Sequence, residues 1–505
     1  MKQLKPVHVV LLASLLVGGV ARFWDLTSHS LFIDEGFTFM VSGRSWSDMF
    51  SQIVYHDFHP PLFYVVTHWL MGALHWQFWD YRYLTASCGL VTIVATWAIA
   101  RRLFGDAAAM VAVVVAAVDP SLIEWDRMYR MYAVMAMLAS VSWWLLLVAS
   151  EARGRAAWWW WLAYGACAVV QPYVQYLGAL NVLCQGLYAL GDIRRRWPVL
   201  ACGAVAALAL LPWLPAIRIQ YPNGGYVNGT SAVPIYWLGI ARDSLATGMP
   251  VKWAVQPWFD PLCTAVALLL AGLGIIRGPR TILPYWLGVA ALQIGLSLVT
   301  GKSLVVPRYL DQVVPAFAIA AGAAVDLGLR TRLRAVALVA AIAMPASLAL
   351  GSADIVLDPY YQTTDWYLVN YVVLQDEHKS DALLFVQGFP YVVVGDFSAF
   401  RGHDAEGPAM PSDVPATLAW LRRHASQRVW YIENQFYYPD PKKKIKAYLD
   451  KTRRVLYVRS ELKSNVADIV NIILYSPAVH VPTKGTRAPG VPKAANVRPV
   501  TRVRV

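Results

Sequence analysis

Residues 31–64 read LFIDEGFTFMVSGRSWSDMFSQIVYHDFHPPLFY and directly follow the first strongly apolar stretch of the chain. Two adjacent carboxylates, Asp34 and Glu35, lie between apolar neighbours, and a second polar segment, His56 to Pro61, leads into apolar sequence again. Ionisable groups beside a membrane lose hydration, so they are retained mainly where they have a function. A solvated loop is the alternative for an isolated Asp–Glu pair. Two such polar segments in one loop of a very apolar chain favour a functional site.

The composition of the whole chain indicates a polytopic α-helical membrane protein. Of its 505 residues, 57% are hydrophobic and 15% are charged, whereas soluble domains carry about 25% charged residues. Apolar stretches of span length recur up to about residue 350. Much of the net charge of +13 lies in short loops between these stretches, so the positive-inside rule explains it without a nucleic-acid partner. The five cysteines fall in or beside apolar stretches at irregular spacing, which predicts neither a disulfide framework nor a zinc site.

We predict about eleven transmembrane helices from the apolar stretches. They are expected near residues 7–24, 81–100, 107–121, 131–149, 157–171, 173–190, 198–214, 260–276, 281–299, 309–328 and 335–350. The segment 61–79 is long enough to cross, but about five arginine clusters share the side of Lys2 and Lys5 only if it does not. We therefore assign it to the membrane interface. The N-terminus is then cytoplasmic, and loop 25–80 is exoplasmic and contains juxtamembrane helices.

The composition changes after residue 350, where charged and amphipathic segments replace the apolar stretches. Residues 1–350 are expected to form the transmembrane domain and residues 351–476 a small exoplasmic α/β domain. Strands are predicted at 382–386, 428–432, 455–459 and 469–475, with helices between them. Residues 477–505 are rich in Pro, Lys and Arg without periodicity, which predicts a disordered basic tail.

The Asp–Glu pair after the first span, followed by HPPLFY at 59–64, resembles the polyprenyl-phosphate-sugar-dependent glycosyltransferases of the GT-C fold. This group includes glycosyltransferase family 39, the protein O-mannosyltransferases, and the lipid A aminoarabinose transferases. Two later segments are similar to the same group: R-x-x-R-x-Y from Arg127, and the Arg-Tyr pair at Arg308 that precedes Pro315. The order and common sidedness of these short motifs make the resemblance specific, and it covers roughly residues 7–350.

The resemblance implies an inverting glycosyltransferase that moves a sugar from a polyprenyl-phosphate donor to an exoplasmic glycolipid, polysaccharide or protein acceptor. It also implies that Asp34 is the catalytic base. A partly desolvated carboxylate has a raised proton affinity, which suits removal of a proton from an acceptor hydroxyl. Glu35 would orient Asp34 or help to recognise the acceptor, and the alternative is a solvated neighbour without a role.

Arg308, together with Tyr309, is the first candidate for binding the donor phosphate. The resemblance places an Arg-Tyr pair at the start of a late span, and a guanidinium matches the geometry of a phosphate and stays charged. The alternative is an arginine whose charge merely reaches the membrane interface from a helix end.

Three further cations are candidates for substrate binding. Arg127 and Arg130 match the resembled motif and lie on the outer side, where positive charge runs against the usual bias. Ion pairs with Glu124 and Asp126 are the alternative explanation for both arginines. Lys302, in the loop before Arg308, is the third candidate.

Asp57 and His59 are further candidates for substrate contact and, with Asp34, for a divalent-metal site of oxygen and imidazole ligands. No spacing rule supports the metal, and the resembled group contains members with and without one. The alternative is that His59 forms hydrogen bonds within its own loop. No other cofactor is predicted.

Two other function classes remain open at this point. A transporter or lipid-linked sugar flippase would place ionisable residues within the spans and show repeat symmetry, whereas the polar groups here cluster on one face. A membrane-anchored binding protein acting through residues 351–475 would not require the acidic loop. We expect a multi-pass protein of a bacterial plasma membrane, with its site and C-terminal domain outside the cell or in the periplasm, serving the cell envelope.

Overall fold

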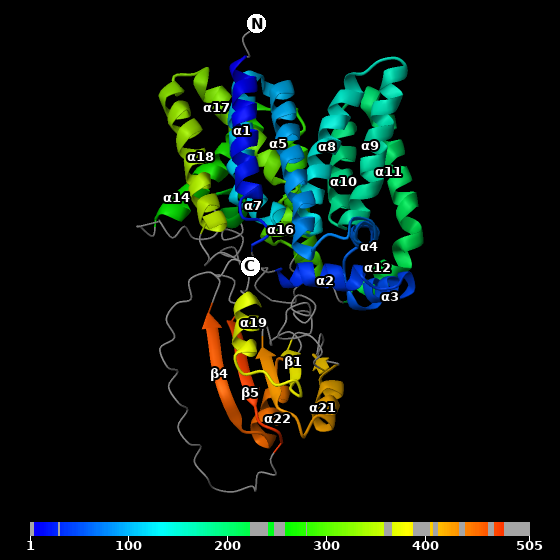
Figure 1. Cartoon of the computed structure of the whole chain (residues 1–505). Coiled ribbons are helices and arrows are strands. Elements are labelled where there is room, and N and C mark those ends of the chain that lie inside the picture. The colour runs from blue at the N-terminus through cyan, green and yellow to red at the C-terminus, as the bar shows by residue number, and fades with distance from the viewer. Residues whose placement is uncertain are drawn as a thin grey trace.

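The computed structural model describes eleven ranges of the chain. They are residues 5–28, 31–222, 241–246, 258–278, 280–302, 304–357, 366–386, 404–407, 413–433, 440–462 and 469–478. A bundle of helices forms one part of the molecule and a small sheet with three helices forms the other (Figure 1). The predicted disordered tail lies outside the described residues, apart from Pro477 and Ala478.

Each predicted span corresponds to one helix of the bundle. These helices are α1 (Pro6–Phe23), α5 (Arg82–Phe104), α6 (Asp106–Val118), α8 (Met131–Glu151), α9 (Arg155–Val174), α10 (Gly178–Ala189), α11 (Ile193–Leu210), α14 (Phe259–Arg277), α15 (Leu283–Thr300), α17 (Val314–Leu329) and α18 (Arg334–Leu357). Within the described residues, seven helices are long and apolar enough to cross a membrane, or eight if α6 and α7 (Pro120–Asp126) count as one bent span. The protein is therefore a multi-pass membrane protein, and the number eleven stays a prediction.

Four shorter helices lie at one end of the bundle: α2 (Ile33–Ser42), α3 (Trp46–His56), α4 (Leu62–Leu74) and α12 (Leu214–Gln220) (Figure 1). The side chain of Ser45 accepts a hydrogen bond from the backbone N–H of Asp48 and caps the start of α3. Helix α4 has 13 residues and is about 20 Å long, whereas the hydrocarbon core of a bilayer is about 30 Å thick. Helices α6 and α10, with 13 and 12 residues, are no longer than α4, so length alone does not decide whether α4 crosses, and the interfacial assignment of segment 61–79 stays a prediction.

The arginine-rich loops lie at the opposite end, with the N-terminus. Arg101 at the end of α5 lies 3.4 Å from the Nε2 atom of His8 in the first turn of α1. Arg102 forms an ion pair with Glu151 at the end of α8. The first loop and the C-terminal sheet share the other end of the bundle (Figure 1). The structure therefore separates the two groups of loops as expected, while their assignment to cytoplasm and exterior remains a prediction.

Close helix packing and a buried ion pair hold the bundle together. A Cβ atom added to Gly322 of α17 would lie 2.3 Å from the carbonyl oxygen of Ala108 in α6, so the missing side chain lets these helices approach. Arg22 near the end of α1 donates from Nε to Oδ2 of Asp126 in α7 at 2.7 Å, and both residues are buried. Buried charges are costly unless they are paired, so this pair fixes α7 against α1.

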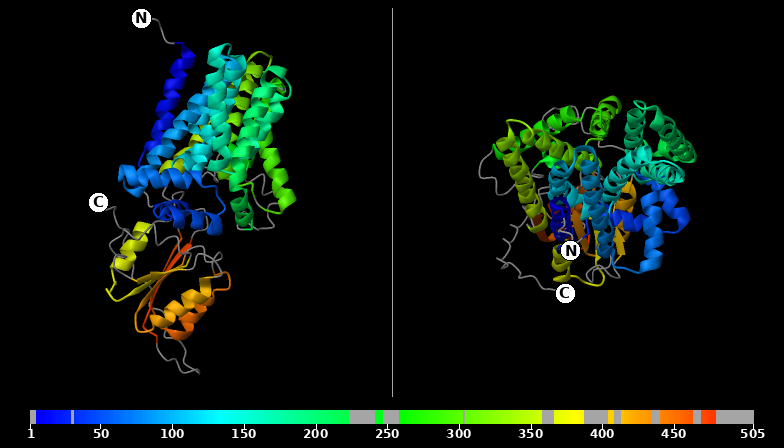
Figure 2. Two further views of the ribbon diagram at one scale, coloured as in Figure 1. Left: turned by 90° about the vertical axis from the view of Figure 1, so that its right-hand side faces the viewer. Right: turned by 90° about the horizontal axis from the view of Figure 1, so that it is seen from above.

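The C-terminal part is a five-stranded mixed sheet with strand order β2-β1-β3-β5-β4. Its strands are β1 (Ala382–Val386), β2 (Asp404–Glu406), β3 (Val429–Glu433), β4 (Val455–Leu462) and β5 (Ile469–Tyr475). Strands β1, β2 and β3 are parallel, and β5 runs antiparallel to β3 and β4. Helices α21 (Val414–Arg423) and α22 (Lys444–Thr452) cover one face and α19 (Trp366–Leu374) lies on the other (Figure 2). The predicted small α/β unit is present, and β2 is a strand that the sequence pattern did not predict.

Candidate active site

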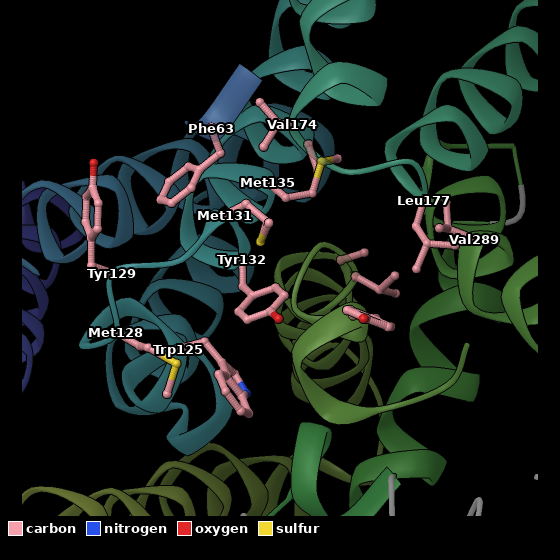
Figure 3. Packing of buried hydrophobic residues seen from close by; sticks show 14 of the residues in the cluster. Phe63, Trp125, Met128, Tyr129, Met131, Tyr132, Met135, Val174, Leu177 and Val289 are labelled. Atoms are coloured by element: carbon pink, nitrogen blue, oxygen red, sulfur yellow. The ribbon is translucent and has the colours of Figure 1, made fainter. Parts of the chain in front are cut away.

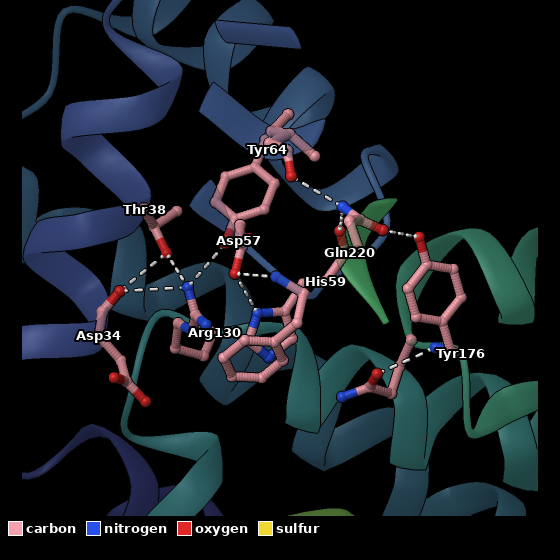
Figure 4. Close-up of polar contacts among 11 residues, drawn as sticks. Asp34, Thr38, Asp57, His59, Tyr64, Arg130, Tyr176 and Gln220 are labelled. Carbon is pink, nitrogen blue, oxygen red and sulfur yellow. Dashed lines mark hydrogen bonds and ion pairs between the residues drawn. The ribbon is translucent and has the colours of Figure 1, made fainter. Parts of the chain in front are cut away.

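The first turn of α2 carries both carboxylates of the first loop. The backbone oxygen of Asp34 accepts hydrogen bonds from the hydroxyl of Thr38 at 3.0 Å and from Nη1 of Arg130 at 3.2 Å (Figure 4). The side chain of Asp34 is half-buried, and no donor among the described residues bonds its carboxylate. The main chain of Asp34 is therefore fixed while its carboxylate is available to a ligand.

Glu35 is completely buried and fully paired. Its Oε1 accepts from Nε of Arg82 at 2.8 Å and from the backbone N–H of Tyr129 at 2.7 Å. Its Oε2 accepts from Nη2 of Arg82 at 2.6 Å and from the backbone N–H of Phe32 at 2.7 Å. Glu35 is thus not a solvated neighbour, and in this position it does not meet an acceptor. It anchors α2 to α5 and to the segment before α8, and so orients Asp34 through the helix.

Arg130 is a second buried cation of this region, after Arg82, at 2% exposure. Its Nη1 donates to the hydroxyls of Thr38 at 2.7 Å and Tyr64 at 3.3 Å (Figure 4). Burial alone would lower its pKa, but neighbouring groups raise that pKa well above the ordinary value. These groups are Tyr64, Tyr132, Asp34 and Asp57. Arg130 therefore stays charged and gives the buried side of the site a fixed positive charge.

Arg127 has a structural role that the sequence did not predict. Its Nη1 donates to the backbone oxygens of Ala21 and Trp24, each at 2.9 Å, at the C-terminal end of α1. Burial, and then the charge of Arg82, lower the pKa of Arg127 to about 10. The alternative of a pair with Asp126 is wrong, because Asp126 pairs with Arg22. Cations suit the unpaired carbonyls at a helix end, so Arg127 caps α1, and its role in substrate binding stays a prediction.

Asp57 and His59 form a buried pair in the loop between α3 and α4. Oδ1 of Asp57 lies 2.9 Å from Nδ1 of His59 and accepts from the backbone N–H of Phe58 at 2.7 Å. Oδ2 accepts from the hydroxyl of Tyr64 at 2.6 Å. Burial would raise the pKa of Asp57, but His59 and Arg130 together lower it below the ordinary value. Asp57 is therefore ionised and holds the ring of His59 in one orientation.

The hypothesis of a metal site built from Asp34, Asp57 and His59 does not fit this geometry. Among the described residues, no group of three or more His, Cys, Asp or Glu side chains could hold one ion. Both oxygens of Asp57 already accept hydrogen bonds within the loop. The Nε2 atom of His59 is buried, and the part of the chain that the structure describes offers it no hydrogen-bond partner.

Arg308 lies in α16 (Pro307–Leu310) among three aromatic rings. Its Cζ atom is 5.8 Å from the ring centroid of Trp125, 5.8 Å from that of Tyr132 and 5.7 Å from that of Tyr309. Trp125 and Tyr132 belong to the buried cluster seen in Figure 3. A guanidinium within about 6 Å of an aromatic face is stabilised as a cation. Arg308 is therefore partly buried and held among aromatic rings.

Tyr132 belongs to the surroundings of both Arg130 and Arg308. It lies close enough to Arg130 to raise the pKa of that guanidinium, and its ring is one of the three around Arg308. Lys302 lies apart from this arrangement: its Nζ donates to the backbone oxygen of Tyr221 and lies 3.9 Å from the Tyr221 ring. Tyr132 thus follows Arg130 by two residues and packs against Arg308, whereas Lys302 is held at the end of α12.

Several residues of the site were not found from the sequence. Arg82 and Thr38 fix the position of α2, and Tyr64 joins Asp57 to Arg130. A signal was present for two of them. Tyr64 ends the HPPLFY segment, and Arg82 is a charged residue at the start of an apolar span.

Comparison with known proteins gives a consistent result. The family model described as dolichyl-phosphate-mannose-protein mannosyltransferase matches residues 58–215. The structure of ArnT from Cupriavidus metallidurans in the apo state aligns with a TM-score of 0.56 and 17% identity over 93% of this chain and 97% of that one. The structure of the same protein bound to undecaprenyl phosphate aligns over the same shares with a TM-score of 0.53 and 16% identity.

A third solved structure has the same architecture. The oligosaccharyltransferase from Archaeoglobus fulgidus, in its apo form, aligns with a TM-score of 0.52 and 11% identity over 85% of this chain and 69% of that one. A comparison with curated protein sequences finds no match. The resemblance predicted from the sequence motifs is thereby confirmed: the chain has the GT-C fold of the ArnT-like and protein-mannosyltransferase-like glycosyltransferases.

Proposed function

We propose that the protein is an inverting glycosyltransferase that moves a sugar from a polyprenyl-phosphate carrier to a hydroxyl of an exoplasmic acceptor. The fold supports the general kind of reaction, and ArnT, which has this fold, has been solved with undecaprenyl phosphate bound. In this proposal the transmembrane domain is residues 1–350, and the first loop faces the outside of a plasma membrane. The domain of residues 351–476 lies on the same side.

The observation that carries the proposal is the carboxylate of Asp34, which accepts no hydrogen bond from the described residues. It lies on helix α2, which Glu35 anchors to its neighbours. The acceptor oxygen forms a bond to the anomeric carbon, the bond between that carbon and the phosphate oxygen breaks, and the acceptor proton goes to Asp34. A single displacement inverts the configuration once. A free carboxylate can accept this proton directly. Hydrogen bonds donated to the carboxylate would stabilise its charged form and make it a poorer base.

The leaving group is polyprenyl phosphate, and its charge must be stabilised as the bond breaks. Arg308 supplies a cation held by three aromatic rings, and preorganised charge of this kind acts without reorganisation during the reaction. Arg130, buried behind Asp34, adds a fixed positive charge. The candidate groups cluster at one end of the bundle, which does not favour a transporter, because transporters usually bind near the midplane of the membrane.

The test compares lipid-linked sugars and envelope glycans, by mass spectrometry, in a deletion strain complemented with different variants. The wild-type gene should remove a polyprenyl-phosphate sugar that accumulates in the deletion strain. Asp34→Asn should lower turnover by roughly 10²–10⁴ at an unchanged protein level. Asp48→Asn, at an exposed carboxylate of the same loop, is the matched control. Restoration by Asp34→Asn would remove the assignment of the base, and no accumulated lipid-linked sugar would contradict the proposed function itself.

A further inference from the structure

A buried glutamine connects the first loop to the rest of the bundle. Gln220 is the last residue of α12 and is 2% exposed. Its Nε2 donates to the backbone oxygen of Ile53 in α3 at 2.8 Å and to that of His59 at 3.0 Å. One amide group therefore holds both the end of α3 and the His59 main chain.

The orientation of this amide is itself fixed (Figure 4). The hydroxyl of Tyr176, in the turn between α9 and α10, donates to Oε1 of Gln220 at 2.5 Å. That hydroxyl accepts from Nε1 of Trp213 at 2.7 Å. An indole N–H can only donate and a phenol has one proton, so the hydrogen bonds run in one direction from Trp213 to His59. If the amide were turned over, its oxygen would face the two backbone oxygens, and its NH₂ group would face the tyrosine hydroxyl that now donates to it.

His59 is thus held twice. Gln220 fixes its main chain and Asp57 fixes its ring through Nδ1. Its Nε2, in a side chain that is more than nine-tenths buried, has no hydrogen-bond partner in the described part of the chain. Buried polar atoms are nearly always paired, so a preset ring nitrogen of this kind is suited to meet an oxygen of a substrate.

We propose that Gln220 is a positioning residue for the proposed sugar transfer, and that it acts by setting the place of His59. The proposal rests on the proposed function, because His59 is taken to contact the substrate of that reaction. Gln220 comes from a helix more than 150 positions further along the chain than His59. The hydrogen bonds of Gln220, Tyr176 and Trp213 therefore make the geometry of the first loop depend on the packing of α9, α10 and α12.

The chain offers a matched control for a buried glutamine. Gln185 in α10 is also buried, its Nε2 donates to the hydroxyl of Ser142 at 2.7 Å, and its Oε1 accepts from the hydroxyl of Tyr164 at 3.1 Å. Both partners lie on neighbouring helices of the bundle. Gln185 has the same residue type, burial and tyrosine donor as Gln220, but it contacts no part of the first loop among the described residues.

The experiment is a double-mutant cycle with the full-length protein in membranes. The probe is the polyprenyl-phosphate sugar that accumulates in the deletion strain, with membranes of that strain as the source of acceptor. We expect Gln220→Met to lower kcat by about 10- to 100-fold, because a small displacement of a substrate contact has a large effect on rate. In a His59→Ala background the same change should have less than about a twofold effect, because coupled sites are not additive.

Gln185→Met should change the thermal stability by a similar amount, with kcat within about twofold of the wild type in both backgrounds. If Gln220→Met does not fold, Tyr176→Phe is a milder variant, because it keeps Gln220 and removes only the hydroxyl that donates to it. Tyr164→Phe, which removes the hydroxyl that donates to Gln185, is the control for Tyr176→Phe. An equal loss of kcat from the Gln220 or Tyr176 change with and without His59 would overturn the proposal, as would normal kcat in these variants. A wild-type protein that converts no lipid-linked sugar would instead show that the proposed function has failed.

Discussion

The structure assigns different work to the two adjacent carboxylates of the first loop, and replacement of Glu35 by Gln tests this directly. Asp34→Asn should affect turnover and leave stability nearly unchanged, since its carboxylate accepts no hydrogen bond from the described residues. Glu35→Gln should do the opposite. Glu35 has two oxygens, and each accepts one bond from Arg82 and one from a backbone N–H.

The size of the effect follows from this arrangement. A glutamine amide has one oxygen, so in either orientation its NH₂ group faces one N–H of Arg82 and one backbone N–H, either that of Tyr129 or that of Phe32. Each buried donor without an acceptor costs about 1–3 kcal/mol. The charge of Arg82 also loses its buried partner, and breaking such a pair costs about 3–5 kcal/mol in total. This is a large part of the typical stability of about 5–15 kcal/mol.

Thermal unfolding of the purified protein, followed by tryptophan fluorescence, measures this loss, and transfer assays are normalised to folded protein. We expect Glu35→Gln to unfold at a clearly lower temperature while the molecules that remain folded keep most of their turnover. Glu35→Gln with wild-type stability and greatly reduced turnover per folded molecule would refute the reasoning, because Glu35 would then act on the substrate itself.

Three further predictions concern the phosphate site, the bundle and the topology. Arg308→Ala should raise the KM for the lipid donor by about 10- to 100-fold. Arg308→Lys should restore the KM only in part, because the point charge of an ammonium replaces a planar guanidinium. A normal KM in both variants would place the phosphate elsewhere. Gly89→Ala should cost about 3–5 kcal/mol of stability, because the new Cβ would lie 2.2 Å from a carboxylate oxygen of Asp126, the partner of Arg22. Gly288→Ala is the control, because its Cβ meets no atom within 4 Å. Equal unfolding temperatures of the two variants would contradict this prediction. The topology can be tested with single cysteines at Ala156 and Ser426 in a protein without its five native cysteines. A membrane-impermeant reagent should label the cysteine at Ser426 and not the one at Ala156. The reverse pattern would invert the proposed topology.

The general architecture was accessible from sequence because it depends on local patterns. Apolar stretches of span length predicted the helices of the bundle to within a few residues, with four exceptions. The helices predicted at 173–190, 198–214 and 309–328 begin at Gly178, Ile193 and Val314, and the helix predicted at 335–350 ends at Leu357. Strands β1 and β5 have the predicted bounds, Ala382–Val386 and Ile469–Tyr475. The short strand β2 was missed, since three residues carry too little pattern to identify it.

The sequence by itself determined that this chain crosses a membrane repeatedly, resembles the GT-C glycosyltransferases and carries an acidic pair in its first loop. The tertiary structure alone decided which carboxylate of that pair is available, because Glu35 meets donors 47 and 94 positions away in the chain. It likewise showed that Arg127 caps α1 while Arg308 lies among aromatic rings. Spans follow from hydrophobic periodicity within one segment, whereas the role of a charged group depends on which distant groups pack against it and remove it from water.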